Sequence, residues 1–186
     1  MLDILYVTGR GGSLDKGLSM YLKERADTFD GVAVDVSFLK QAPLAQVEFI
    51  QAKLKEKPER LIIANSYGAY LTLQSLVECS VRLKHVLLLS PVLGIAQAKD
   101  RMYMSRPPLT GRLKEAFETI TVNAPDTFKI LIGGQDELYN DQQLAYVESY
   151  FGKGSIIVLE NESHMIEKSL ISAFLDEQFG VYLNTL

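Results

Sequence analysis

Three side chains in this sequence could together make a serine hydroxyl reactive: Ser66, Asp136 and His164. A serine becomes a nucleophile when a histidine takes its proton and an acidic side chain orients that histidine. Each of the three residues follows a short apolar run and lies in a segment of small or polar residues. They can form a site only if the fold brings these three segments together.

The segment around Ser66 predicts a strand, a sharp turn and a helix. An apolar run at residues 61–63 leads into Ala64-Asn65-Ser66-Tyr67-Gly68, and apolar residues recur at helical spacing over 69–77. This A-x-S-x-G string is a variant of the G-x-S-x-G nucleophile elbow, whose strained turn raises the serine hydroxyl above the sheet edge. A serine at such a junction can also be only a helix N-cap. The string therefore leaves both interpretations open.

Only two histidines are present, so the candidate base can be chosen by elimination. His85 directly precedes an apolar run, so we expect it on the surface at the N-terminal end of a strand, away from Ser66. His164 follows the run at 156–159 through a short loop. Because ligands of open parallel sheets bind outside the carboxyl ends of the strands, His164 is the candidate base. The alternative is a loop histidine without a role.

The candidate acid is Asp136, which follows the apolar run at 128–132. Gly133 and Gly134 lie between this run and the aspartate and allow the backbone to turn sharply. Glu137 and Asp141 are nearby competitors for the same role. Asp136 could instead be a turn or helix-capping residue.

A glycine-rich loop, Thr8-Gly9-Arg10-Gly11-Gly12, follows the first apolar run. Attack of a serine on a carbonyl places negative charge on the oxygen, and backbone N–H groups must be in position to receive it. We expect an oxyanion hole made by the amide of Tyr67 and the amide of Arg10, with Gly11 as the second choice in the loop. A phosphate-binding loop is the alternative, although the glycine spacing fits neither common phosphate-binding pattern.

The elements that would position these residues alternate between strand and helix. This alternation predicts a three-layer α/β/α sandwich with a mainly parallel sheet of about six strands. The strands are expected at residues 4–7, 32–38, 61–64, 86–89, 128–132 and 156–159. The helical patterns lie at residues 14–22, 44–54, 71–77, 113–120, 144–151 and 166–179.

Composition narrows the class of protein. The length of 186 residues fits a single domain over residues 1–186, and a net charge of −4 without a basic run makes nucleic acid an unlikely partner. We expect no membrane span and no signal peptide, and the single cysteine, Cys79, is expected to be a packing residue. These features favour a cytoplasmic setting. No metal or other cofactor is expected, because no His/Cys cluster is present.

One connection between expected strands is long, at residues 91–127, and could be a lid or a substrate-specificity insertion. Within it, Met102, Tyr103 and Met104 could line an acyl pocket. Arg101 and Arg106 could bind a carboxylate. The alternative is a loop that packs its own apolar residues and exposes its arginines.

With these motifs the chain resembles the α/β-hydrolases, in particular small single-domain serine hydrolases such as the retinoblastoma-binding-protein type and related bacterial proteins. The order Ser66, Asp136, His164 is the triad order of that superfamily. The resemblance implies a parallel sheet with helices on both faces and hydrolysis of a small ester, thioester or amide through an acyl-enzyme. Two positions depart from the pattern: Ala64 replaces the first elbow glycine, and Thr8 stands where many members have histidine.

Two other functions remain open at this point. A non-catalytic interaction module could keep the same fold. A flavodoxin-like nucleotide binder would share the alternating pattern but would leave the order of the serine, aspartate and histidine unexplained. The partner expected from the resemblance is a small-molecule acyl substrate.

Overall fold

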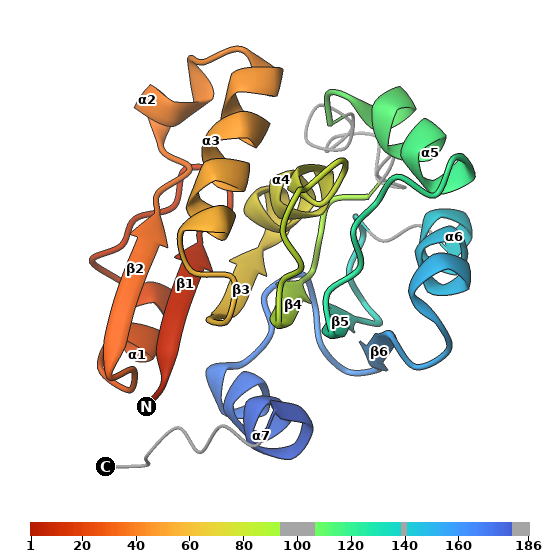
Figure 1. The fold of residues 1–186 in the computed structure, drawn as a ribbon. Helices are drawn as coiled ribbons and strands as arrows, with labels where there is room; N and C mark the ends of the chain where they lie inside the picture. The colour runs from red at the N-terminus through yellow and green to blue at the C-terminus, as the bar shows by residue number, and fades with distance from the viewer. Residues whose placement is uncertain (94–106, 139–140, 180–186) are drawn as a thin grey trace.

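The computed structural model describes residues 1–93, 107–138 and 141–179 of the chain (Figure 1). In the described part, six strands form one sheet in the order β2-β1-β3-β4-β5-β6, and every neighbouring pair is parallel. This confirms the predicted α/β class. The strands are β1 (Asp3–Val7), β2 (Thr28–Val32), β3 (Leu61–Asn65), β4 (His85–Leu89), β5 (Thr127–Gly133) and β6 (Ile156–Leu159).

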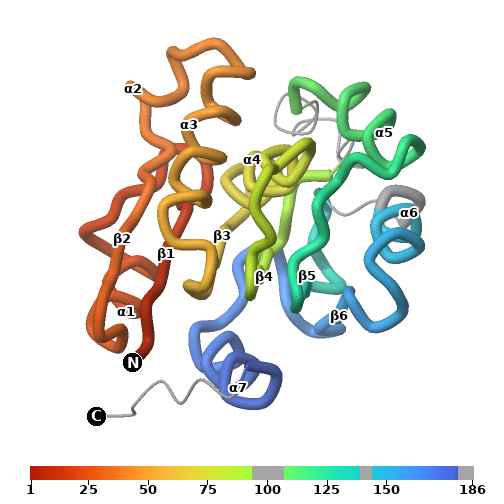
Figure 2. Tube along the Cα trace, in the orientation of Figure 1, coloured from red at the N-terminus to blue at the C-terminus, as the bar shows by residue number. Residues whose placement is uncertain are grey.

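Helices cover both faces of the sheet and make the three layers (Figures 1 and 2). Helices α1 (Leu18–Lys23) and α7 (Lys168–Phe179) share one apolar core with one face of the sheet. The other face packs against α2 (Val36–Leu39), α3 (Pro43–Glu56), α4 (Ser66–Ser75), α5 (Thr110–Glu118) and α6 (Asp141–Phe151). Among the described residues, no helix has the length and apolar character needed to cross a membrane.

The central strands are apolar at successive positions because both of their faces are covered. In β3, Leu61 and Ile63 belong to the core shared with α1 and α7, whereas Ile62 and Ala64 belong to the core on the opposite face. Side chains that alternate across a strand thus have a buried partner on either side. All four residues are at most 4% exposed.

The second strand is not where the sequence pattern put it. Residues 32–38 were expected to be a strand, but β2 ends at Val32 and α2 begins at Val36. The carboxylate of Asp35 accepts the backbone N–H of Phe38 at 2.8 Å and caps α2. Asp35, which lies inside the expected strand, is therefore the N-cap of a helix.

The strand order places the three candidate residues at one edge of the sheet. Ser66 follows β3, Asp136 follows β5 and His164 follows β6. Since all six strands are parallel, their carboxyl ends lie at the same edge, which is where ligands bind in open sheets of this kind.

Candidate active site

Ser66 is the first residue of α4, directly after β3. Its φ angle is 51°, a left-handed conformation that is uncommon for a residue other than glycine. The N-cap of α4 is Asn65, so the alternative that Ser66 caps the helix is wrong. A non-glycine residue held in this conformation at a strand-to-helix turn has the geometry of a nucleophile elbow.

Close packing explains why small residues surround this turn. A Cβ atom at Gly68 would lie 2.1 Å from the carbonyl oxygen of Thr8, and a Cβ at Gly9 would lie 3.2 Å from the Cβ of Ser66. The first turn of α4 therefore rests directly on the end of β1 and on the loop that follows it. The glycine-rich loop and the serine are held against each other by this contact.

The structure brings Ser66, Asp136 and His164 together. His164 Nε2 lies 2.9 Å from Ser66 Oγ, and His164 Nδ1 lies 2.8 Å from Asp136 Oδ2. The side chain of Asp136 is only 1% exposed, whereas that of His164 is 22% exposed. The other carboxylate oxygen, Asp136 Oδ1, accepts the backbone N–H of Leu138 at 2.9 Å. The aspartate thus also forms the local turn that was considered as its alternative role.

These contacts indicate the protonation of the imidazole. An ionised carboxylate can only accept, so the pair at 2.8 Å requires His164 Nδ1 to carry the proton. In that tautomer Nε2 has a free lone pair, and it faces the hydroxyl of Ser66. The arrangement can remove a proton from the serine hydroxyl and stabilise the imidazolium that results.

Gly133 and Gly134 allow the two loops of the site to approach each other. A Cβ at Gly133 would lie 2.2 Å from the carbonyl oxygen of Ser163, next to His164. Neither glycine has a positive φ angle, so their importance is the close approach rather than an unusual backbone turn. The N–H of Gln135 donates to the carbonyl of Glu162 at 2.9 Å and fixes this contact.

The competing residues do not form these contacts. Asp136, not Glu137, lies against the imidazole, and the side chain of Asp141 is outside the described residues. His85 lies at the opposite edge, as the first residue of β4. It is half-buried rather than on the open surface, with its ring 5.6 Å from that of Phe179. Burial, together with the charge of Lys84, lowers the pKa of His85.

The backbone amides around Ser66 differ in availability. The N–H of Gly11 donates to the carbonyl of Val34 at 2.8 Å and is already engaged. Within the described residues, neither Tyr67 nor Arg10 uses its backbone N–H in a hydrogen bond. Tyr67 lies in the first turn of α4, where free N–H groups and the helix dipole favour negative charge. Tyr67 and Arg10 are thus the free donors among the three amides named from the sequence.

Thr8 has a structural role at the position where many α/β-hydrolases have histidine. It is 2% exposed, and its hydroxyl oxygen accepts the N–H of Val34 at 2.9 Å. The same hydroxyl donates to the carbonyl of Gly9 at 3.1 Å. Thr8 thereby ties the glycine-rich loop to the chain that leaves β2.

Comparison with solved structures decides the fold family. The ydeN gene product of B. subtilis superposes with a TM-score of 0.67 at 10% identity, over 97% of this chain and 100% of that chain. The chain has the α/β-hydrolase fold. A 2-hydroxy-6-oxo-6-phenylhexa-2,4-dienoate hydrolase from Rhodococcus sp. strain RHA1 gives a TM-score of 0.62 at 16% identity, over 96% and 90% of the two chains. Est1E from Butyrivibrio proteoclasticus gives 0.61 at 14% identity, over 96% and 88%.

Similarity in sequence is much weaker than similarity in structure. No protein-family model matches the sequence, and no curated protein is similar to it in sequence. Identities of 10–16% to the solved structures show the α/β-hydrolase fold alone. The activity must therefore be argued from the residues of this chain.

The substrate residues named from the sequence lie outside the described part of this α/β-hydrolase fold: Arg101, Met102, Tyr103, Met104 and Arg106. Sequence reasoning missed a different feature, a cavity of about 440 Å³ between α4, α5 and α6. Its walls come from four separate segments, so no local pattern could have identified it. In the described residues, no group of three or more His, Cys, Asp or Glu side chains could hold a metal ion.

Proposed function

We propose that the chain is a serine hydrolase that cleaves a small ester, thioester or amide through an acyl-enzyme. The observation that carries this proposal is the position of His164 between Ser66 Oγ, at 2.9 Å, and Asp136 Oδ2, at 2.8 Å. The solved structures with the same fold support it, since they include a dienoate hydrolase and a thioesterase domain.

In the first half of the proposed reaction, Ser66 Oγ attacks the carbonyl carbon while its proton moves to His164 Nε2. Asp136 accepts the Nδ1–H and stabilises the imidazolium. The carbonyl oxygen gains the negative charge, and the N–H groups of Tyr67 and Arg10, which donate to no other described backbone group, are the proposed donors to it. His164 then returns the proton to the leaving group as its bond to the carbonyl carbon breaks.

In the second half, water attacks the ester formed on Ser66. His164 takes a proton from this water and returns it to Ser66 Oγ as the acyl group leaves. Each step uses a side chain or amide of this chain and a water molecule. The engaged amide of Gly11 has no part in the reaction.

The test is the hydrolysis of p-nitrophenyl acetate by the wild-type protein and by the Ser66→Ala variant. We expect kcat to fall by about 10³-fold or more, because the nucleophile is removed while the rest of the site remains. Circular dichroism checks that both proteins are folded. Equal turnover by a folded Ser66→Ala variant would exclude Ser66 as the nucleophile.

A further inference from the structure

The cavity on the helical face that carries α4 has the size of a small-molecule site. Its volume is about 440 Å³, within the range of ligand pockets in proteins. The walls are mainly apolar and aromatic. The apolar lining residues are Tyr70, Leu93, Leu113, Phe117 and Val147.

The inner walls of this cavity are part of the packed core, whereas its outer side is lined by exposed residues: Thr110, Gly111, Lys114 and Tyr146. Each of the five apolar lining residues is at most 8% exposed. The ring of Phe117 is surrounded by aromatic rings of α6, with centroid distances of 5.6 Å to Tyr146, 4.9 Å to Tyr150 and 6.0 Å to Phe151. A cavity built from such residues is already formed before any ligand enters, and it favours an apolar one.

Two short connections link the cavity to Ser66. Tyr70 follows Ser66 by four residues on α4, about 6 Å further along the helix axis. Leu93 follows Val92, whose N–H donates to the carbonyl of Ser66 at 3.4 Å. Both of these walls are therefore joined to Ser66 by short stretches of chain.

Hydrogen bonds hold the wall formed by α5 against α4. The hydroxyl of Tyr70 donates to the carbonyl of Pro108, and Gln74 Nε2 donates to the carbonyl of Leu109 at 2.8 Å. The guanidinium of Arg112 donates to the backbone carbonyl of Gln74, also at 2.8 Å. The spacing between the two helices, and hence the width of the cavity, is fixed by these contacts.

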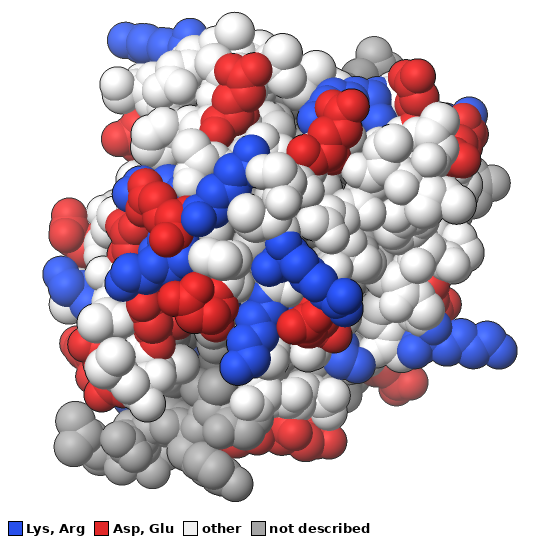
Figure 3. Space-filling model, in the orientation of Figure 1, with Lys and Arg blue, Asp and Glu red and all other residues white. Residues whose placement is uncertain are grey.

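The interior of the cavity carries no charge of its own. Lys114 is the one charged side chain among its described lining residues, and it is 72% exposed, with its Nζ 3.8 Å from the carboxylate of Glu118. On the outer surface, Figure 3 shows charged side chains of both signs mixed over much of this face, while the surface over α6 is largely uncharged. Burial of an unpaired charge is strongly unfavourable, so a charged group would be excluded from this interior.

From these contacts we infer that the cavity binds the acyl group of the substrate and selects uncharged, medium-length acyl groups over acetyl. This inference rests on the proposed function, in which the acyl group is attached to Ser66. Each additional methylene buried against the apolar walls should raise kcat/KM by about fourfold until the cavity is filled.

Gly111 offers a way to fill the cavity without disturbing the fold. It lines the cavity, and a Cβ atom added there would meet nothing within 4 Å. A tryptophan at this position therefore has room for its first atoms and occupies cavity volume with its ring. Glu115→Trp is the matched control, because Glu115 is an exposed residue of the same helix that does not line the cavity.

The measurement is kcat/KM for p-nitrophenyl acetate, butyrate and octanoate. In the wild-type protein the octanoate-to-acetate ratio should be at least about tenfold. Gly111→Trp should lower this ratio by about tenfold or more, and Glu115→Trp should leave it within about twofold. An unchanged ratio in Gly111→Trp, or an equal loss in Glu115→Trp, would overturn the inference.

The Ser66→Ala variant separates failure of this inference from failure of the proposed function. If it loses turnover while Gly111→Trp leaves the ratio unchanged, the function stands and the cavity assignment fails. If Ser66→Ala keeps full turnover, the function fails, and calorimetric binding of octanamide, an uncharged compound of the same chain length, then tests the cavity. Binding that Gly111→Trp weakens by about tenfold or more supports an acyl site. Absent or equal binding overturns it.

Discussion

At the scale of single residues, both oxygens of the Asp136 carboxylate have a fixed partner. One oxygen lies 2.8 Å from His164 Nδ1, and the other accepts the N–H of Leu138 at 2.9 Å. With its side chain 1% exposed, the carboxylate has almost no contact with solvent. It can therefore hold the imidazole in one orientation and in one tautomer.

Replacing Asp136 with asparagine should keep the shape of the site but not its function. The amide group can donate to His164 Nδ1, which favours the tautomer that can no longer take the proton of Ser66. We expect kcat on p-nitrophenyl acetate to fall by about 10³- to 10⁴-fold, with an unchanged circular dichroism spectrum.

Glu137→Gln is the control for this substitution, because Glu137 is the neighbouring acid in the sequence, whereas the hydrogen bond to the imidazole comes from Asp136. It should retain kcat within about twofold of wild type. A comparable loss of kcat in the two variants would contradict a specific role of Asp136 in orienting His164.

The sequence could predict that these residues meet, but not every detail of their surroundings. Ser66, Asp136 and His164 each follow a strand, and parallel strands end at one edge, so their meeting followed from the topology. The engagement of the Gly11 amide could not be foreseen. Its acceptor is the carbonyl of Val34, in a segment that was expected to be a strand.

At the scale of elements, the contact of α4 with the end of β1 sets the position of the serine. Gly68 is the residue where this contact is tightest, with the carbonyl oxygen of Thr8 2.1 Å from the position of a Cβ atom. The neighbouring atoms include the backbone of Thr8, which cannot move without displacing the glycine-rich loop.

Gly68→Ala should therefore destabilise the protein, although alanine normally favours a helix. We expect a loss of about 1–3 kcal/mol in the free energy of unfolding, measured by urea denaturation. Gly111→Ala in α5 is the matched control, because a Cβ there meets nothing within 4 Å. It should be neutral or stabilising by up to about 1 kcal/mol. A Gly68→Ala variant as stable as Gly111→Ala would contradict the packing argument.

The apolar runs predicted five of the six strands at close to their observed positions, because each of these strands is a continuous run of mainly apolar residues. The cavity could not be predicted in this way. Its walls come from α4, the chain after β4, α5 and α6. The sequence of one of these segments does not show which of the other segments it faces. The sequence pattern predicted substrate-binding residues within 101–106 instead.

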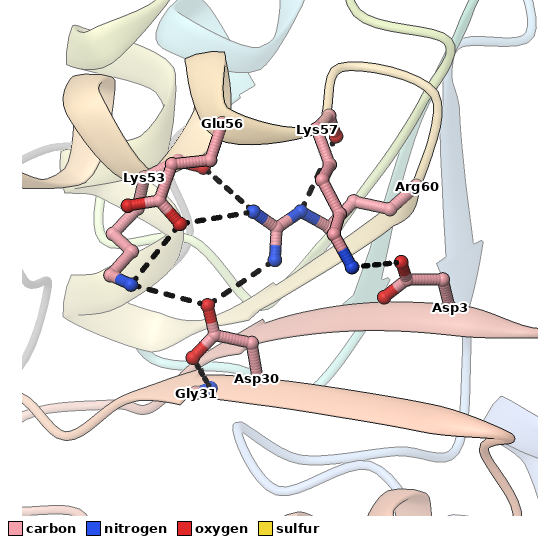
Figure 4. Close-up of polar contacts among 7 residues, drawn as sticks. All are labelled: Asp3, Asp30, Gly31, Lys53, Glu56, Lys57 and Arg60. Carbon is pink, nitrogen blue, oxygen red and sulfur yellow. Dashed lines mark hydrogen bonds and ion pairs between the residues drawn. The ribbon is translucent and has the colours of Figure 1, made fainter.

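At the scale of the whole molecule, the edge of the sheet opposite Ser66 is held together by charges (Figure 4). Arg60, whose side chain is 2% exposed, contacts the carboxylates of Asp30 at 3.3 Å and Glu56 at 3.6 Å. Lys53 contacts the same two carboxylates, at 3.3 and 3.2 Å. This cluster joins β2, the end of α3 and the start of β3, far from the proposed chemistry.

Ionisation of the Asp30 carboxylate makes the contribution of this cluster to stability depend on pH. Burial raises its pKa, but the N–H of Gly31 and the cations Lys53 and Arg60 favour the ionised form more strongly, so the pKa lies below its ordinary value. A lowered pKa in the folded state stabilises the protein above the pKa of the unfolded chain, about 3.9. That contribution is lost as the pH falls through the folded-state value.

Asp30→Asn should thus be less stable than wild type at pH 7 by about 1 kcal/mol, a modest value because the carboxylate is partly exposed. The deficit should shrink as the pH is lowered below about 4, where the wild-type carboxylate also becomes neutral. Urea denaturation of both proteins at pH 7 and pH 3 measures the difference. A deficit of the same size at both values would show that charge is not its cause.

The most direct test of the central claim is covalent labelling by a fluorophosphonate, followed by mass spectrometry of the intact protein and its peptides. The proposed mechanism predicts one adduct, on Ser66, which is absent in Ser66→Ala. In His164→Ala the labelling rate should fall by about 100-fold or more, because the proton acceptor is missing. A folded wild-type protein that remains unlabelled, or an adduct formed as fast without His164, would contradict the mechanism and favour a non-catalytic role for this fold.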